Sequence, residues 1–218
     1  MKYVSHDIIS NGEIDQLISI FNNHSEYTYT AGMKKVGLDP NNSDLFELLT
    51  DIISNRLNIT GEYDIIGDNF FEHSYSYFPH CDALQDNSWL NILIPLKLYN
   101  QRQLQEFIVF DQQYTAGGAT WIGNYPLDGN FLYNKKLSSR ICESDNVINL
   151  TDTTIDDKLY NSLFQKYMPS DYLFGMSGTV FNWSPGDVIV FNSKYIHSTG
   201  KMQCLKKLGL SIRIGHKK

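Results

Sequence analysis

The sequence predicts a mainly β protein, an antiparallel sandwich or barrel with flanking helices. Segments rich in Ile, Val, Phe and Tyr dominate the chain after residue 70, as expected of strands. Segments with helical spacing of apolar residues cluster before residue 60. Strands and helices do not alternate regularly, as they would in a protein with a parallel sheet, so the antiparallel class is favoured.

Three helices are expected from the spacing of apolar side chains. The first covers residues 12–23 and the second residues 44–58, where Asn42 or Ser43 can cap the first turn. A third helix is expected over residues 155–168, because apolar residues recur there at every fourth position before a proline.

Six strands account for most of the remaining chain. They are expected at residues 70–78, 89–98, 106–114, 178–184, 187–197 and 207–215. A Ser-Pro-Gly-Asp turn separates the fourth strand from the fifth.

The chain of 218 residues is expected to form a single domain. A helical flank would occupy about residues 1–65 and a barrel about residues 70–215, with an irregular insertion at about residues 115–177. Nothing in the sequence indicates an oligomeric state.

Composition excludes several classes of partner. The net charge is −6, and no run of Lys or Arg exceeds two residues, so nucleic acid is not expected as a partner. No apolar run approaches the length of a membrane span, and the N-terminus lacks a signal-peptide pattern. The three widely spaced cysteines fit unpaired thiols in a reducing, cytoplasmic environment.

A candidate metal site begins at His80-Cys81-Asp82, where a strand-like segment ends. By itself a His-x-Asp triplet is common and indicates little. Its weight comes from a second histidine, His197, which follows a turn and an apolar strand far downstream. Two imidazoles and one carboxylate are the facial triad that leaves open positions on a non-haem iron.

The last expected strand carries a basic residue on a small, polar face. In LGLSIRIG, apolar side chains alternate with Gly209, Ser211 and Arg213. A guanidinium on such a face suits a ligand carboxylate held by two parallel hydrogen bonds, although an edge-strand arginine reaching into water is the simpler alternative.

The order of these motifs resembles the Fe(II)/2-oxoglutarate-dependent oxygenase superfamily, over about residues 70–215. The resemblance extends to its prolyl-hydroxylase-like and phytanoyl-CoA-dioxygenase-like branches. It implies a double-stranded β-helix, the cupin-like jelly roll, with Fe(II), 2-oxoglutarate and O₂ as cofactor and co-substrates. It also implies hydroxylation of a C–H bond with release of succinate and CO₂.

Carried over by position, the resemblance implies that His80, Asp82 and His197 bind the iron. Arg213 is favoured as the residue that anchors 2-oxoglutarate, because of its planar fork. Lys207 is the alternative anchor, at the spacing found in the lysine-using branch. Tyr77 matches a tyrosine that prolyl-hydroxylase-like members use on the co-substrate, but a packed strand tyrosine is an equal alternative.

Two other functions stay open from the sequence. A cupin-like metalloprotein could use the same ligands without 2-oxoglutarate. A non-catalytic jelly-roll module could instead present Tyr and Trp side chains as a binding face. For the oxygenase, a small molecule or a peptide side chain is the expected substrate, with specificity arising from residues 115–177.

Overall fold

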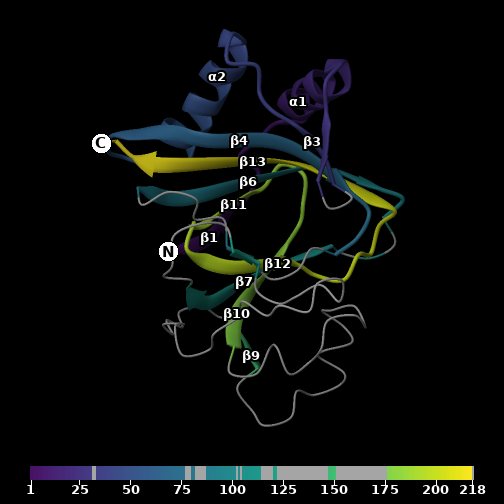
Figure 1. Cartoon of the computed structure of the whole chain (residues 1–218), viewed down its shortest axis with the longest axis vertical. Helices are drawn as coiled ribbons and strands as arrows, with labels where there is room; N and C mark the ends of the chain where they lie inside the picture. Colours follow the sequence, from purple (N-terminus) through teal and green to yellow (C-terminus); the bar gives the residue numbers. More distant parts are fainter. Residues whose placement is uncertain are drawn as a thin grey trace.

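Two antiparallel sheets stacked on each other form the body of the protein. The structure is a computed structural model that describes residues 1–30, 33–76, 80–81, 87–101, 103, 105–113, 120–121, 147–150 and 176–217. The helices α1 (Asn11–Asn23) and α2 (Ser43–Thr50) cover the outer face of the larger sheet, and the smaller sheet lies on its other side (Figure 1).

The two sheets draw their strands from distant parts of the chain. The larger sheet has the order β1 (Lys2–Ser5), β11 (Val188–Asn192), β6 (Ser88–Tyr99), β13 (Lys206–His216), β4 (Tyr63–His73), β3 (Met33–Val36) and β2 (Thr28–Thr30). The smaller sheet has the order β8 (Thr120–Trp121), β5 (His80–Cys81), β12 (Tyr195–Thr199), β7 (Glu106–Gln113), β10 (Met176–Asn182) and β9 (Val147–Leu150).

Both N-terminal helices begin at the side-chain caps that the sequence provides. Ser10 accepts a hydrogen bond from the Glu13 amide while the Glu13 side chain accepts one from the Ser10 amide, which is a capping box. Asn42 caps α2 as predicted, and a π-helical segment, η1 (Asp51–Arg56), continues it. The third expected helix, residues 155–168, lies outside the described residues.

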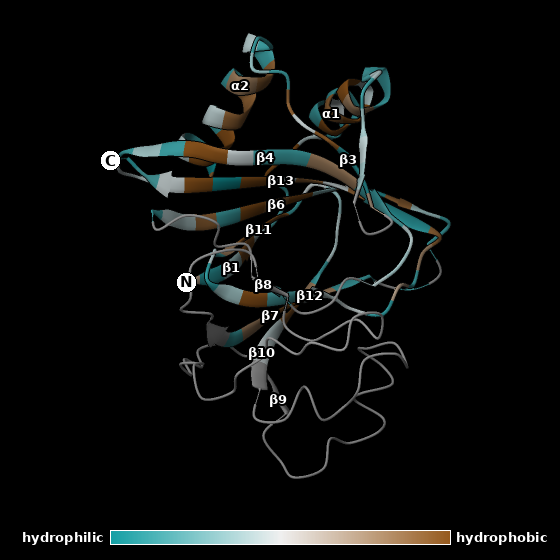
Figure 2. Ribbon diagram, viewed as in Figure 1, coloured by the Kyte–Doolittle hydropathy of each residue, from teal (hydrophilic) through white to brown (hydrophobic). Residues whose placement is uncertain are grey.

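Strand β13 separates two hydrophobic cores. Its residues Leu208, Leu210, Ile212 and Ile214 face the helices and are fully buried. The alternate residues face the smaller sheet, as the period of two requires. Figure 2 shows this alternation as bands of brown and teal along β4, β13 and β6. The predicted mixture of strands and flanking helices is therefore confirmed.

Several predicted boundaries were wrong. The expected strand 187–197 is two strands, β11 and β12, separated by a turn at Ser193-Lys194 and placed in different sheets. The expected strand 70–78 starts earlier, because β4 runs from Tyr63 to His73. The N-terminal flank also contains the short strands β1, β2 and β3. The division into one domain with an insertion stays a prediction.

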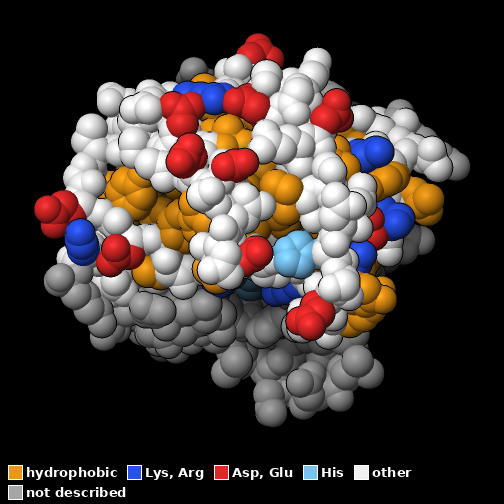
Figure 3. All heavy atoms as spheres, turned by 90° about the horizontal axis from the view of Figure 1, so that it is seen from above, with side chains coloured by type: hydrophobic (Ala, Val, Ile, Leu, Met, Phe, Trp, Pro, Cys, Tyr) orange, Lys and Arg blue, Asp and Glu red, His pale blue; other side chains and the backbone are white. Residues whose placement is uncertain are grey.

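The surface above the helices is polar with apolar patches. Seen from that side, Asp and Glu side chains gather around exposed apolar atoms (Figure 3). Within the part of the chain that the structure describes, neither helix has the length and apolar content needed to cross a bilayer.

Candidate metal and co-substrate site

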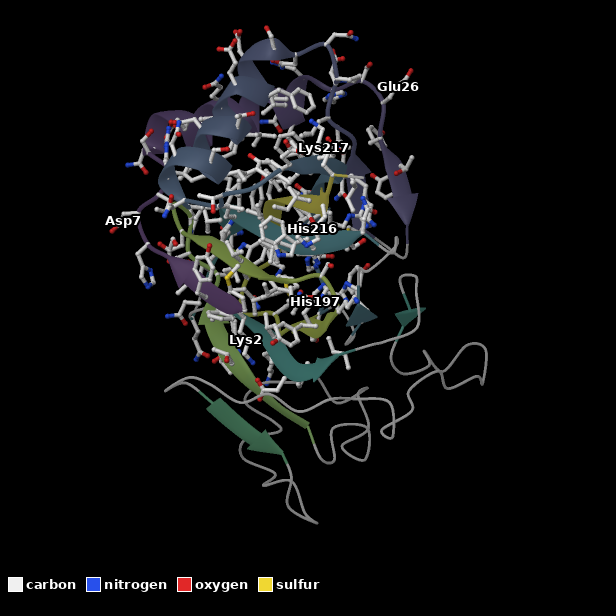
Figure 4. All side chains as sticks on the ribbon, turned by 90° about the vertical axis from the view of Figure 1, so that its left-hand side faces the viewer. Lys2, Asp7, Glu26, His197, His216 and Lys217 are labelled. Carbon is white, nitrogen blue, oxygen red and sulfur yellow. The ribbon has the colours of Figure 1, made fainter. Side chains whose placement is uncertain are left out.

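Two of the predicted metal ligands lie side by side. His80 on β5 is directly opposite His197 on β12, so both side chains leave the same face of the smaller sheet. Their ring centroids are 4.2 Å apart. His197 is only 2% exposed and lies between the two sheets (Figure 4). Residues separated by more than half of the chain thus form one pair of imidazoles.

The surroundings of His197 fix its orientation and its tautomer. Nδ1 lies 3.1 Å from the backbone oxygen of Tyr195, and because a carbonyl only accepts, Nδ1 carries the proton. The lone pair is then on Nε2, the arrangement expected of a metal-binding histidine. The rings of Phe107 and Phe191 pack against the imidazole, at centroid distances of 5.7 and 4.7 Å.

The third predicted ligand, Asp82, and the predicted co-substrate contact, Tyr77, lie outside the described residues. Among the residues that are described, no group of three metal-binding side chains occurs. The roles of Asp82 and Tyr77 therefore stay predictions. Of the three predicted ligands, the structure describes the two imidazoles.

A buried ammonium group lies close to the imidazole pair. Lys207, the second residue of β13, is 1% exposed and donates a hydrogen bond of 3.1 Å to Oγ1 of Thr199. Thr199 is two residues after His197 on the same face of β12, which is about 7 Å along a strand. The Nζ atom also lies 3.9 Å from the ring centroid of Trp183 and 5.8 Å from that of Phe107.

The charge of Lys207 is not neutralised by a carboxylate of any described residue. Burial therefore dominates and lowers the pKa of Lys207 to about 7, from its usual value near 10.5. A buried cation without a counter-ion is costly, and an anionic ligand would relieve that cost.

His73 adjoins the ammonium and stays neutral. Burial, with a smaller contribution from the charge of Lys207, lowers the pKa of His73 to about 3. Its Nδ1 donates a hydrogen bond of 2.6 Å to the backbone oxygen of Tyr75. This hydrogen bond fixes the orientation of the His73 ring.

Comparison with known proteins supports the fold. No family model matches the chain, and no curated protein matches its sequence. Among solved structures, SnoN, a non-haem α-ketoglutarate-dependent epimerase from nogalamycin biosynthesis, superposes with a TM-score of 0.56 at 11% identity. The match covers 99% of this chain and 78% of SnoN.

Two further structures agree. HygX from Streptomyces hygroscopicus, solved with nickel and 2-oxoglutarate bound, gives a TM-score of 0.55 at 12% identity, over 99% of this chain and 83% of HygX. A prolyl-4-hydroxylase from Pseudomonas putida gives 0.52 at 10% identity, over 100% and 93% of the two chains. The chain has the double-stranded β-helix fold of the 2-oxoglutarate oxygenases.

Within this double-stranded β-helix, the two predicted anchors lie apart. Arg213 is six residues from Lys207 on the same face of β13, so the two Cα atoms are about 20 Å apart along the strand. The guanidinium of Arg213 lies over Gly67 of β4, where a Cβ atom would come within 2.5 Å of it. Lys207, not Arg213, is the fully buried cation.

Two residues near the pair were missed in the sequence. Thr199 could have been found, because a residue two positions after His197 must share its face of the strand. Trp183 carries no such signal. Its ring covers Lys207 only because β10 and β13 approach each other in the folded chain.

Proposed function

We propose that this protein is an Fe(II)/2-oxoglutarate-dependent dioxygenase that hydroxylates a C–H bond of a small molecule or a peptide side chain. The observation that carries the proposal is a buried ammonium, without a carboxylate partner among the described residues, close to a pair of imidazoles. The pair supplies ligands for a metal, and Lys207 supplies the charge that a dicarboxylic co-substrate requires.

The residues present suit iron. His197 offers Nε2, and the ring of His80 lies beside it, at a centroid distance of 4.2 Å. Asp82 would add the carboxylate that completes a facial triad. Bound there, Fe(II) would supply the activation of O₂ coupled to oxidative decarboxylation of 2-oxoglutarate to succinate and CO₂.

Lys207 is proposed as the anchor of the co-substrate, with Thr199 beside it. Lys207 would donate charge-assisted hydrogen bonds to the distal carboxylate, and the Thr199 hydroxyl can add another. The Arg213 guanidinium lacks this burial and this proximity to Thr199. The geometry thus favours the lysine alternative over the arginine that the planar-fork argument favoured.

The walls of the site keep water away from the proposed carboxylate. Phe107 lies between His197 and Lys207, and Trp183 covers the ammonium. In such an apolar setting the attraction between ammonium and carboxylate is stronger than in water. His73, which is neutral, adds no competing charge.

An anaerobic titration tests the proposal. Fe(II)-loaded protein is titrated with 2-oxoglutarate, and the metal-to-ligand charge-transfer absorption is followed. We expect saturable absorption from the wild type and none from His197→Ala. His216→Ala, which removes an exposed histidine stacked on Trp89, should behave as wild type.

The other outcomes point to the alternative functions. Tight iron binding without the charge-transfer band would indicate a cupin-like metalloprotein that does not use 2-oxoglutarate. Wild-type protein that binds no iron would contradict the proposal and favour a jelly-roll binding module. A cytoplasmic location and the absence of nucleic-acid and membrane partners belong to the same proposal, and fractionation of cells expressing the protein tests them.

A further inference from the structure

Two cations share the inner face of β13, and aromatic rings stand between them. Lys207 and Arg213 lie at the two ends of this face, with Gly209 and Ser211 between them. A Cβ atom at Gly209 would come within 2.6 Å of the Trp183 ring and 2.8 Å of the Phe71 ring. These rings therefore fill the space over Gly209 and separate the surroundings of Lys207 from those of Arg213.

The guanidinium of Arg213 is held in place without being neutralised. It makes no hydrogen bond and no ion pair with any residue that the structure describes. Asp68 is adjacent in sequence to Gly67 and feels the charge of Arg213, but its carboxylate accepts a hydrogen bond from the Leu38 amide. In the part of the chain that the structure describes, the five N–H donors of the guanidinium thus have no acceptor.

The residues that pair with Arg213 across the sheet are small or polar. They are Gly67 on β4 and Asn91 on β6, and the neighbouring row on the inner face consists of Asn69, Ser211 and Leu93. Of these side chains only Leu93 is large and apolar. Gly67 is required for the observed position, because an added Cβ would lie 2.5–2.9 Å from three guanidinium atoms.

This end of the face also lies near the imidazole pair. The ring of Phe191 packs against His197, and Phe191 pairs with Asn91, which pairs with Arg213. His73, whose pKa the neighbouring His80 influences, pairs with Lys207 at the opposite end of the face. The inner face of the larger sheet, which carries the guanidinium on β13, therefore faces the two histidines.

We propose that Arg213 binds a carboxylate of the substrate, so that the substrate of the proposed oxygenase is a small organic acid. The inference rests on the proposed function and assigns the two cations to different ligands, Lys207 to the co-substrate and Arg213 to the substrate. A guanidinium suits this role because its planar fork can donate two parallel hydrogen bonds to one carboxylate.

The test pairs each acid with its amide. Zn(II)-substituted protein saturated with 2-oxoglutarate is titrated calorimetrically with L-amino acids, short dipeptides, their C-terminal amides and simple phosphate monoesters, at millimolar concentrations. The Fe(II) protein is assayed for succinate release with the same compounds. We expect at least one acid to bind and stimulate succinate release, and its amide to do neither.

Three variants separate the role of Arg213 from general effects. Arg213→Gln should weaken the binding of the responding acid by about 10- to 100-fold, the range expected for the loss of charge-assisted hydrogen bonds. Gly67→Ala should weaken it as well, because it displaces the guanidinium while the protein stays folded. Lys194→Gln removes an exposed positive charge and should leave binding unchanged.

The 2-oxoglutarate titration of the same samples distinguishes the two proposals. If the wild type does not bind 2-oxoglutarate, the proposed function fails regardless of the acids. If Arg213→Gln loses 2-oxoglutarate binding, Arg213 is the anchor and this inference is overturned. It is also overturned if no acid binds, if amides bind as well as acids, or if only phosphate monoesters respond.

Discussion

Replacing Lys207 by methionine is expected to stabilise the ligand-free protein and to weaken its binding of 2-oxoglutarate. Methionine is unbranched like lysine and only one atom shorter, but it removes a charge that has no carboxylate partner among the described residues. A pKa of about 7 in place of 10.5 means that protonation of this group costs up to about 5 kcal/mol more in the folded protein than in the unfolded chain.

The size of the stabilisation depends on pH. Below pH 7 the folded protein carries the buried charge, so the full cost is present. Between pH 7 and 10.5 the unfolded chain binds more protons than the folded protein, and wild-type stability rises with pH. The stability gained by Lys207→Met should therefore be largest in mildly acidic solution and disappear as the pH approaches 10.5.

The assays are denaturant unfolding of metal-free protein at about pH 6 and about pH 9, with the anaerobic 2-oxoglutarate titration alongside. We expect the variant to bind 2-oxoglutarate about 100-fold more weakly, because a buried carboxylate would lose its charged partner. In the wild type, affinity should also fall as the pH rises above 7. A variant that binds 2-oxoglutarate as tightly as wild type would refute the assignment of Lys207.

Three further predictions concern the scaffold. Gly209→Ala forces a methyl group against two aromatic rings and should lower the free energy of unfolding by about 1–3 kcal/mol, measured by denaturant titration. Arg56→Met removes the partner that holds the pKa of Glu13 at about 2, and should lower the free energy of unfolding by about 1 kcal/mol near neutral pH. This difference should vanish as the pH falls from 4.5 towards 2 in parallel unfolding curves. Lys2→Met should cost about 3–5 kcal/mol by stranding the buried carboxylate of Asp111, and the double variant with Asp111→Leu should recover much of it in thermal denaturation.

Much of the fold was predictable because local patterns carry it. The first helix, the Asn42 cap of the second helix and the alternation along β13 all follow from neighbouring residues, and the structure confirms them. The break between β11 and β12 was missed because Asn192-Ser193-Lys194 interrupts the β-prone segment for only three residues. Turn-forming side chains were the available signal.

The sequence predicts the residue types of the candidate site but not how deeply each of them is buried. The alternation in the sequence places Lys207 and Arg213 on one face of the strand, but it does not predict which of the two is more deeply buried. Their difference arises from tertiary structure, because Trp183 and Thr199 enclose one end of the strand and leave the other partly exposed. The direct pairing of His80 with His197 likewise depends on strand register, which no local pattern specifies.

The position of β13 has a consequence for how the chain folds. This strand lies between β6 and β4, and its residue Lys207 pairs with Leu98 on one side and His73 on the other. Until it docks, both neighbours present unpaired strand edges, and the contacts it makes are distant in sequence. Such topologies fold slowly and aggregate readily while incomplete. We therefore expect chaperones or low temperature during synthesis to raise the yield of soluble protein more than substitutions at the helical surface.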